Sequence, residues 1–109
     1  MGTAAGSLVT QAHTQVQAGN YELAEQTIER ALRIEPDNPL LWVELARVWM
    51  GEGDAIQADS TSRRALALAQ GDRQVQASAW RLIAESLRAR ARNQEAIAAD
   101  REAIALAAQ

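Results

Sequence analysis

GNYELAEQTIERALRIEPDNP, residues 19–39, contains in order a turn, an amphipathic run and a stop signal. Gly19 can adopt the left-handed conformation that ends a helix, and Asn20 is a candidate N-cap for the next helix. Pro36 lacks an amide proton and cannot continue that helix. Asn38 is then the predicted N-cap of the next helix, and Pro39 is its predicted first residue. The stretch therefore predicts one helix over 22–34, with both of its ends defined, and the start of another helix.

The same signals recur along the chain at a nearly constant distance. Gly19 and Ala24 return 34 residues later as Gly53 and Ala58, and Ala58 returns after a further 38 residues as Ala96. No segment alternates as a strand would, so the pattern is helical throughout. The four additional residues of the second spacing equal about one helical turn, and we expect one longer helix there rather than a new loop. The predicted helices span 4–17, 22–34, 39–51, 55–69, 73–90 and 94–108.

Composition excludes most kinds of chemistry. The 109 residues have a net charge of −3, one histidine (His13) and no cysteine. We therefore predict no enzyme, cofactor or metal site, because nucleophile–base pairs and the usual zinc ligands are missing. The acidic balance and the lack of a long apolar run argue against nucleic acid and direct membrane insertion. The basic segment RARAR at 88–92 is interpreted as a solvated helix end, since Glu85 and Glu95 dilute its field.

Helix-turn-helix units of this length and composition resemble the tetratricopeptide repeat, whose pattern runs W-x2-L-G-x2-Y, then A, a large apolar residue, A and P. The second unit matches it through Trp42, Leu45, Ala46, Trp49, Gly53, Ala58 and Ala65. The first matches through Leu8, Ala12, Gly19, Tyr21, Ala24, Ile28, Ala31 and Pro36. The third matches through Trp80, Ile83, Ala84, Leu87, Ala96 and Ala103.

The resemblance implies an all-α fold: a right-handed superhelical stack of three helix-turn-helix units with six antiparallel helices. The units would span about 5–38, 39–72 and 73–109 of a single domain, or of a fragment of a longer chain. Five positions depart from the pattern, and there we expect local adjustments of packing without a change of architecture: Gln11, Gln15, Ser62, Ala91 and Asp100.

Stacked units of this family form a concave groove lined mainly by their first helices. The resemblance places these candidates in the groove: Val9, His13, Leu40, Val43, Glu44, Arg47, Met50, Arg81, Leu82, Glu85 and Arg88. Their mixture of apolar and charged groups suits an extended peptide or a helix of a partner protein. The alternative interpretation is that they are ordinary exposed residues of a scaffold.

One specific function of the family can be excluded residue by residue. Chaperone-binding members clamp a C-terminal carboxylate with Lys, Asn and Arg side chains. None of these residue types occupies the matching positions, which hold Val9, His13, Glu44, Ser78 and Leu82.

Two function classes remain. The first is a non-catalytic adaptor in bacterial assembly that binds a protein or peptide in the groove. The second is a structural module that forms a weak homodimer through its uncapped last helix, with Ile97 and Ile104 at the contact. Short modules of this kind resemble those of envelope assembly proteins and lipoproteins, which favours the bacterial cell envelope over the cytoplasm.

Overall fold

The protein, described over residues 1–108 by a computed structural model, forms six α-helices and no strand within that range. Each helix begins and ends within one residue of its predicted bounds, so the all-α prediction is confirmed. The helices are α1 (Thr3–Gln17), α2 (Tyr21–Ile34), α3 (Pro39–Glu52), α4 (Ala55–Leu68), α5 (Arg73–Ala89) and α6 (Asn93–Ala107).

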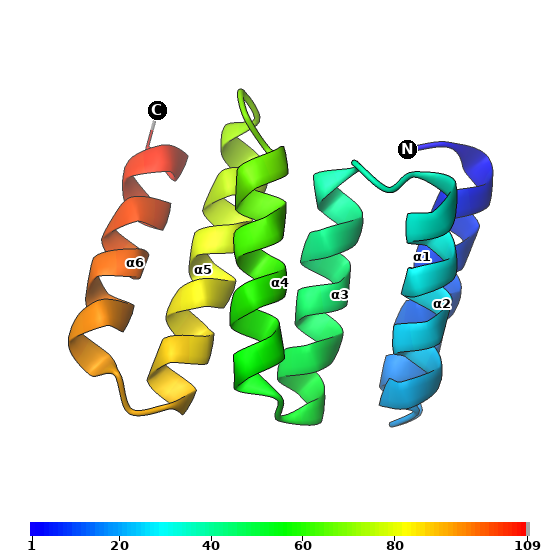
Figure 1. Ribbon diagram of the computed structural model, residues 1–109, viewed down its shortest axis with the longest axis horizontal. Helices are drawn as coiled ribbons and strands as arrows, with labels where there is room; N and C mark the ends of the chain where they lie inside the picture. Colours follow the sequence, from blue (N-terminus) through cyan, green and yellow to red (C-terminus); the bar gives the residue numbers. More distant parts are fainter. Residues whose placement is uncertain (109) are drawn as a thin grey trace.

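The helices stand side by side in a row of three pairs (Figure 1). The molecule measures 37 × 29 × 18 Å. Helix α3 packs against both α1 and α2, and we call this contact the first junction. Helix α5 packs against both α3 and α4, and we call this contact the second junction. On its other side α5 packs against α6. Within residues 1–108, α6 packs against α5 alone.

The predicted helix starts are present. Asn38 precedes α3, its side chain accepts a hydrogen bond of 3.0 Å from the amide of Leu40, and Pro39 is the first helical residue. Asp72 caps α5 in the same way. Asn20 stands at the N-cap of α2, but its side chain makes no capping hydrogen bond.

The turn after each first helix has the same backbone geometry. Gly19 and Gly53 have φ of 79° and 86°, and Ala91 reaches the same region with φ of 59° although it carries a side chain. The additional residues of the second spacing lengthen α5, which has 17 residues against 14 in α3. Both observations agree with the sequence pattern, since Ala91 occupies the position of the two glycines.

Small residues mark the lines along which helices meet. The alanines of the three repeated positions are at most 2% exposed: Ala12, Ala24, Ala31, Ala46, Ala58, Ala65, Ala84, Ala96 and Ala103. A methyl side chain allows two helices to approach closely, and larger side chains fill the space alongside. The architecture therefore follows from the same positions that define the repeat.

Three of the polar residues that depart from the repeat pattern form local hydrogen bonds or ion pairs. Ser62 is fully buried and donates its hydroxyl proton to the carbonyl of Ala58 at 2.6 Å. Gln15 accepts a hydrogen bond of 2.8 Å from the hydroxyl of Thr27. Asp100 forms an ion pair with Arg88. In each case the polar group that replaces an apolar one has a partner, and Ser62, which is buried, requires one.

Candidate functional site

A hollow of about 260 Å³ opens between α1 and α3, on the face where the first helices of the units lie side by side. It is lined by His13, Val16, Gln17, Glu44, Arg47 and Val48. Three of these residues were predicted to lie in the groove, and the structure brings those three together.

The polar part of the hollow is a three-residue network. His13 Nε2 lies 2.8 Å from one oxygen of Glu44, and Arg47 Nη1 donates to the other oxygen at 3.1 Å. Because an ionised carboxylate only accepts, Nε2 of His13 is the protonated ring nitrogen. Glu44 is 15% exposed at the helix contact, whereas His13 and Arg47 are 57% and 53% exposed. A partner would therefore meet the two donors first, with the carboxylate beneath them.

The apolar part of the hollow continues into the core. Val48 is 4% exposed and belongs to the first hydrophobic cluster, and Val16 packs against the same cluster. Leu40 lies one turn before Glu44 on α3 and is 44% exposed. The hollow thus offers an apolar floor with a fixed set of hydrogen-bonding groups at its edge, the usual composition of a recognition site.

Two predicted groove residues lie in the core. Val43 and Leu82 are 1% and 6% exposed and belong to one cluster with Val75 and Ala79. The reason is that α5 packs directly against α3 in the second junction, so both side chains fill the contact between the helices. Neither side chain is available to a partner.

The remaining predictions are dispersed over the surface. Val9 and Met50 are half-buried against the two neighbouring clusters. Arg88 pairs with Asp100 of α6, and Glu85 is exposed. Arg81 lines a separate hollow between α5 and α6. The structure therefore places the candidate site on α1 and α3, with no contribution from α5 to the hollow.

Ile97 and Ile104, the residues predicted to mediate self-association, are 44% and 67% exposed on α6. Over residues 1–108, no helix has the length and hydropathy that a membrane span requires, and no cluster of three potential metal ligands is found.

Three residues of the hollow were missed from the sequence. Val16 and Gln17 follow His13 by three and four residues, and Val48 follows Glu44 by four, so all three share a helix face with predicted residues. Helical spacing could have found them. The register carried over from the family instead selected Val43, which the second junction buries.

Comparison with known proteins agrees with this architecture. A family model of the tetratricopeptide repeat matches residues 15–84, more than half of the chain. The solved structure of the globular C-terminal domain of P. aeruginosa LpoP is 33% identical in sequence, with a TM-score of 0.92. That match covers 94% of this chain and 97% of the other. Curated protein sequences yield no match. The chain belongs to the tetratricopeptide repeat family.

Proposed function

We propose that this protein is an adaptor that binds a peptide or a helix of a partner protein in the hollow between α1 and α3. The observation that carries the proposal is the combination of an apolar floor with two exposed donors, His13 and Arg47, fixed on one carboxylate. Membership of a family of interaction modules supports the same conclusion.

The contacts define what the partner should present. An apolar side chain of the partner would enter the hollow, where Val16 and Val48 line the apolar part. Arg47 uses one nitrogen on Glu44 and keeps further N–H groups for a carboxylate or carbonyl of the partner. The fixed position of the guanidinium lowers the entropy lost when the partner binds.

We also propose a bacterial setting for this adaptor, in the assembly of the cell envelope. The similarity to a domain of a P. aeruginosa protein supports a bacterial origin. The envelope assignment rests on the resemblance to envelope assembly modules.

Peptides selected from a random display library on the 109-residue protein provide the test. Arg47→Glu should weaken the best peptides at least fivefold, because it replaces a donor and adds a second carboxylate beside Glu44. Arg30→Glu, an exposed change on α2, is the matched control and should leave binding unchanged. Thermal melting of both variants verifies that the fold is retained. Chemical shift changes centred on residues 22–34, rather than on the hollow, would overturn the assignment.

A further inference from the structure

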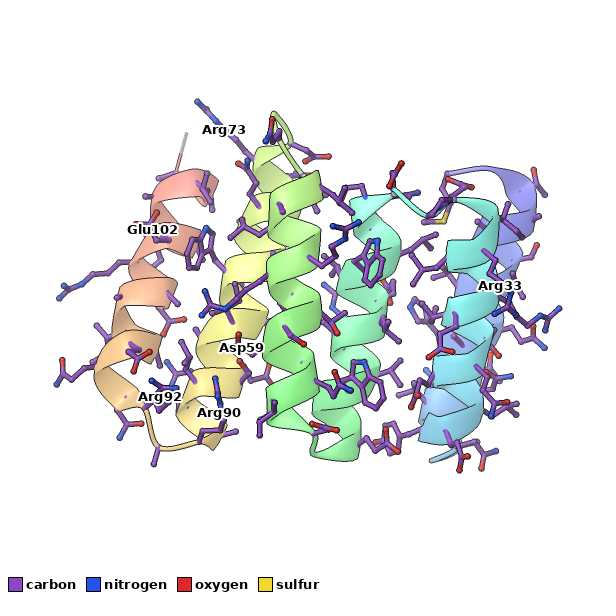
Figure 2. All side chains as sticks on the ribbon, viewed as in Figure 1. Arg33, Asp59, Arg73, Arg90, Arg92 and Glu102 are labelled. Atoms are coloured by element: carbon purple, nitrogen blue, oxygen red, sulfur yellow. The ribbon has the colours of Figure 1, made fainter. Side chains whose placement is uncertain are left out.

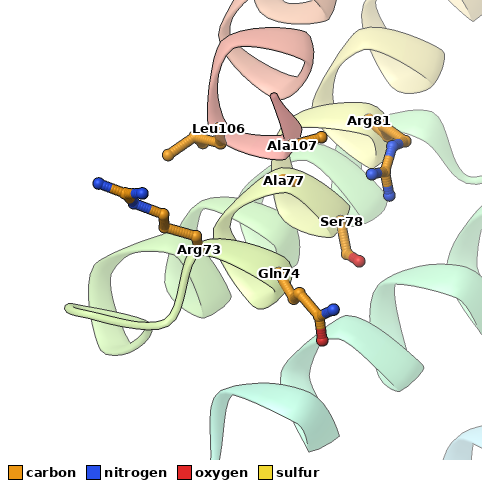
Figure 3. A pocket seen from close by; sticks show the side chains of 7 residues that line it. All are labelled: Arg73, Gln74, Ala77, Ser78, Arg81, Leu106 and Ala107. Carbon is orange, nitrogen blue, oxygen red and sulfur yellow. The ribbon is translucent and has the colours of Figure 1, made fainter. Parts of the chain in front are cut away.

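The outer surface of the last pair, formed by α5 and α6, is a second recessed surface, which we call the end face. One hollow of about 440 Å³ is lined by Arg73, Gln74, Ala77, Ser78, Arg81, Leu106 and Ala107. Figure 3 shows these residues, with Ala107 of α6 close to Ala77 of α5. A second hollow of about 270 Å³ shares Arg81 and Ala107 and adds Asp100, Ala103 and Ile104.

The protein itself shows what occupies equivalent surfaces. The corresponding face of the first pair is covered by α3, and that of the second pair is covered by α5. Spacings of 34 and 38 residues place Ile104 of α6 at the position of Leu32 in α2 and Leu66 in α4. Leu32 is 9% exposed, and Leu66 packs against both neighbouring clusters, whereas Ile104 is 67% exposed. The end face therefore has the shape of a helix-docking surface.

The end face differs from its counterparts in charge. Arg81 occupies the position of Val9 and Val43, and Arg88 occupies the position of Val16 and Met50. Arg88 is paired with Asp100, but Arg81 forms no ion pair with any residue from 1 to 108. The additional first turn of α5 supplies Arg73, which also forms no ion pair within that range. Glu85, at the position of His13 and Arg47, is an exposed carboxylate beside them. The end face is therefore cationic at the end formed by Arg73 and Arg81, where the first two pairs are apolar.

We infer that the end face docks an acidic amphipathic helix of a partner protein. The apolar side of the partner helix would lie on Ala103 and Ile104. Its apolar residues would have the same spacing as Leu41, Leu45 and Val48, through which α3 packs on the first pair. In α3 Glu44 meets His13, and the equivalent of His13 in α5 is Glu85. The carboxylates of the partner helix would therefore precede its first apolar anchor, on the side of Arg73 and Arg81. This site is separate from the hollow between α1 and α3.

The first helix of a second copy of this chain fits the end face poorly. The positions of α1 that correspond to Leu41, Leu45 and Val48 are Ser7, Gln11 and Thr14, and all three are exposed. A head-to-tail dimer would therefore place a polar helix on Ile104 and bury little apolar surface.

Two synthetic 16-residue helical peptides test the inference. Both carry leucines at positions i, i+4 and i+7, and they differ only in having Glu or Lys at the flanking positions. The Glu peptide should bind at least tenfold more tightly than the Lys peptide. Its NMR shift changes should fall on residues 73–81 and 103–107 and leave His13 and Arg47 unaffected.

Two variants and their controls complete the experiment. Arg81→Glu should reverse the preference between the peptides, whereas Arg47→Glu should leave it unchanged, which separates this site from the proposed groove. Ile104→Glu should abolish binding of the Glu peptide. Ile56→Glu, at an equally exposed isoleucine of α4 (69%), should not affect it.

Equal binding of the two peptides, or shift changes confined to α1 and α3, would overturn the inference. Sedimentation supplies an independent outcome. A dimer that is dissociated by Ile104→Glu but insensitive to Arg81→Glu would show that a second copy occupies the end face instead.

Discussion

The two junctions occupy equivalent positions in the repeat but distribute apolar and polar groups differently. In the first junction α3 contributes Leu41, Leu45 and Val48 to one apolar cluster with α1 and α2. The equivalent residues of α5 are Ala79, Ile83 and Ser86. The first junction is therefore closed by large side chains on α3, while the second has smaller ones and a polar group inside.

The outer edges of the junctions differ in the sign of their charges. Glu25 of α2 and Glu52 of α3 form the edge of the first junction. The equivalent residues in the second junction are Asp59 of α4 and Arg90 of α5, whose side chains are joined by an ion pair of 2.9 Å (Figure 2). The same pair of positions thus holds two carboxylates in one junction and opposite charges in the other.

The ion pair of the second junction belongs to a larger network of polar side chains. Asp59 is 9% exposed and also accepts hydrogen bonds from Arg63 and from Ser86, which is fully buried. Arg90 is 28% exposed, and its Nε is buried without a hydrogen-bond partner. Such a network depends on every member, because removal of one leaves another charge desolvated.

The comparison shows that the repeat specifies where the helices touch. The polar residues at the junctions differ from one junction to the other. The first junction keeps its polar network, His13, Glu44 and Arg47, on the exposed side, where a partner can reach it. The second junction places Asp59 and Ser86 of its network in the interior, and its Arg90 is less exposed than His13 and Arg47. The recognition site that we propose lies at the junction whose charged groups are more exposed.

The largest predicted effect concerns the apolar contact of the first junction. Leu41 is fully buried, so Leu41→Ala should cost about 3 kcal/mol in free energy of unfolding, through lost transfer energy and a cavity. Leu40→Ala, at the preceding residue with 44% exposure, is the control and should change stability by less than about 0.5 kcal/mol. Urea denaturation measures both. Equal losses for the two variants would mean that α3 is rotated relative to its assigned face.

The polar network of the second junction gives the next effect. Asp59→Asn should cost about 2 kcal/mol, because Arg90 would stay largely buried without its counter-charge. Double-mutant cycles with Arg90→Gln, followed by thermal melting, measure the coupling of the pair. A coupling near zero would show that the network contributes geometry but no stability.

The turn that follows α5 gives a smaller effect of opposite sign. Ala91→Gly should stabilise the protein by about 1 kcal/mol, since glycine adopts φ of 59° without the steric cost that alanine incurs. Ala18→Gly is the matched control, because Ala18 has φ of −84° and gains nothing from glycine. Differential scanning calorimetry should show a rise in Tm for the first variant alone.

The smallest effect concerns the acidic edge of the first junction. Burial raises the pKa of Glu25, and the neighbouring carboxylates of Glu52, Glu29 and Glu22 raise it further. Ionisation of Glu25 therefore opposes folding, and stability from this group is lost as pH rises from the ordinary glutamate range through the raised pKa.

Glu25→Gln should accordingly stabilise the protein by about 0.5 kcal/mol at pH 7, and the gain should vanish near pH 4. Glu102→Gln, on α6 away from this cluster, serves as the control at both pH values. A gain that is the same at pH 4 and pH 7 would rule out charge repulsion as its cause.

The fold could be predicted because its determinants are local. Turn residues, caps and alanines at fixed spacing specify six helices and their contacts, and they need no knowledge of distant side chains. Even Ala91 was recognisable as a turn residue by its register with Gly19 and Gly53.

The site could be predicted only in part, because groove residues depend on how far neighbouring units rotate. Register predicted His13, Glu44 and Arg47, which line one hollow, and their role in binding stays a prediction. Val43 and Leu82 were assigned to the surface because their burial depends on the close contact of α5 with α3. The Asp59–Arg90 pair was missed for a similar reason, since its partners are 31 residues apart and meet only after stacking.

The position of α5 in contact with α3, α4 and α6 has a consequence for local opening. Helix α6 can detach by leaving one neighbour, whereas α5 cannot leave without disrupting three. Amide hydrogens of α6 should therefore exchange through local unfolding, and those in the middle of α5 only when the whole chain unfolds. Because α6 supplies half of the end face, a helix docked there would slow exchange in α6 first. Hydrogen exchange in α6 would then report most directly on an occupied end face.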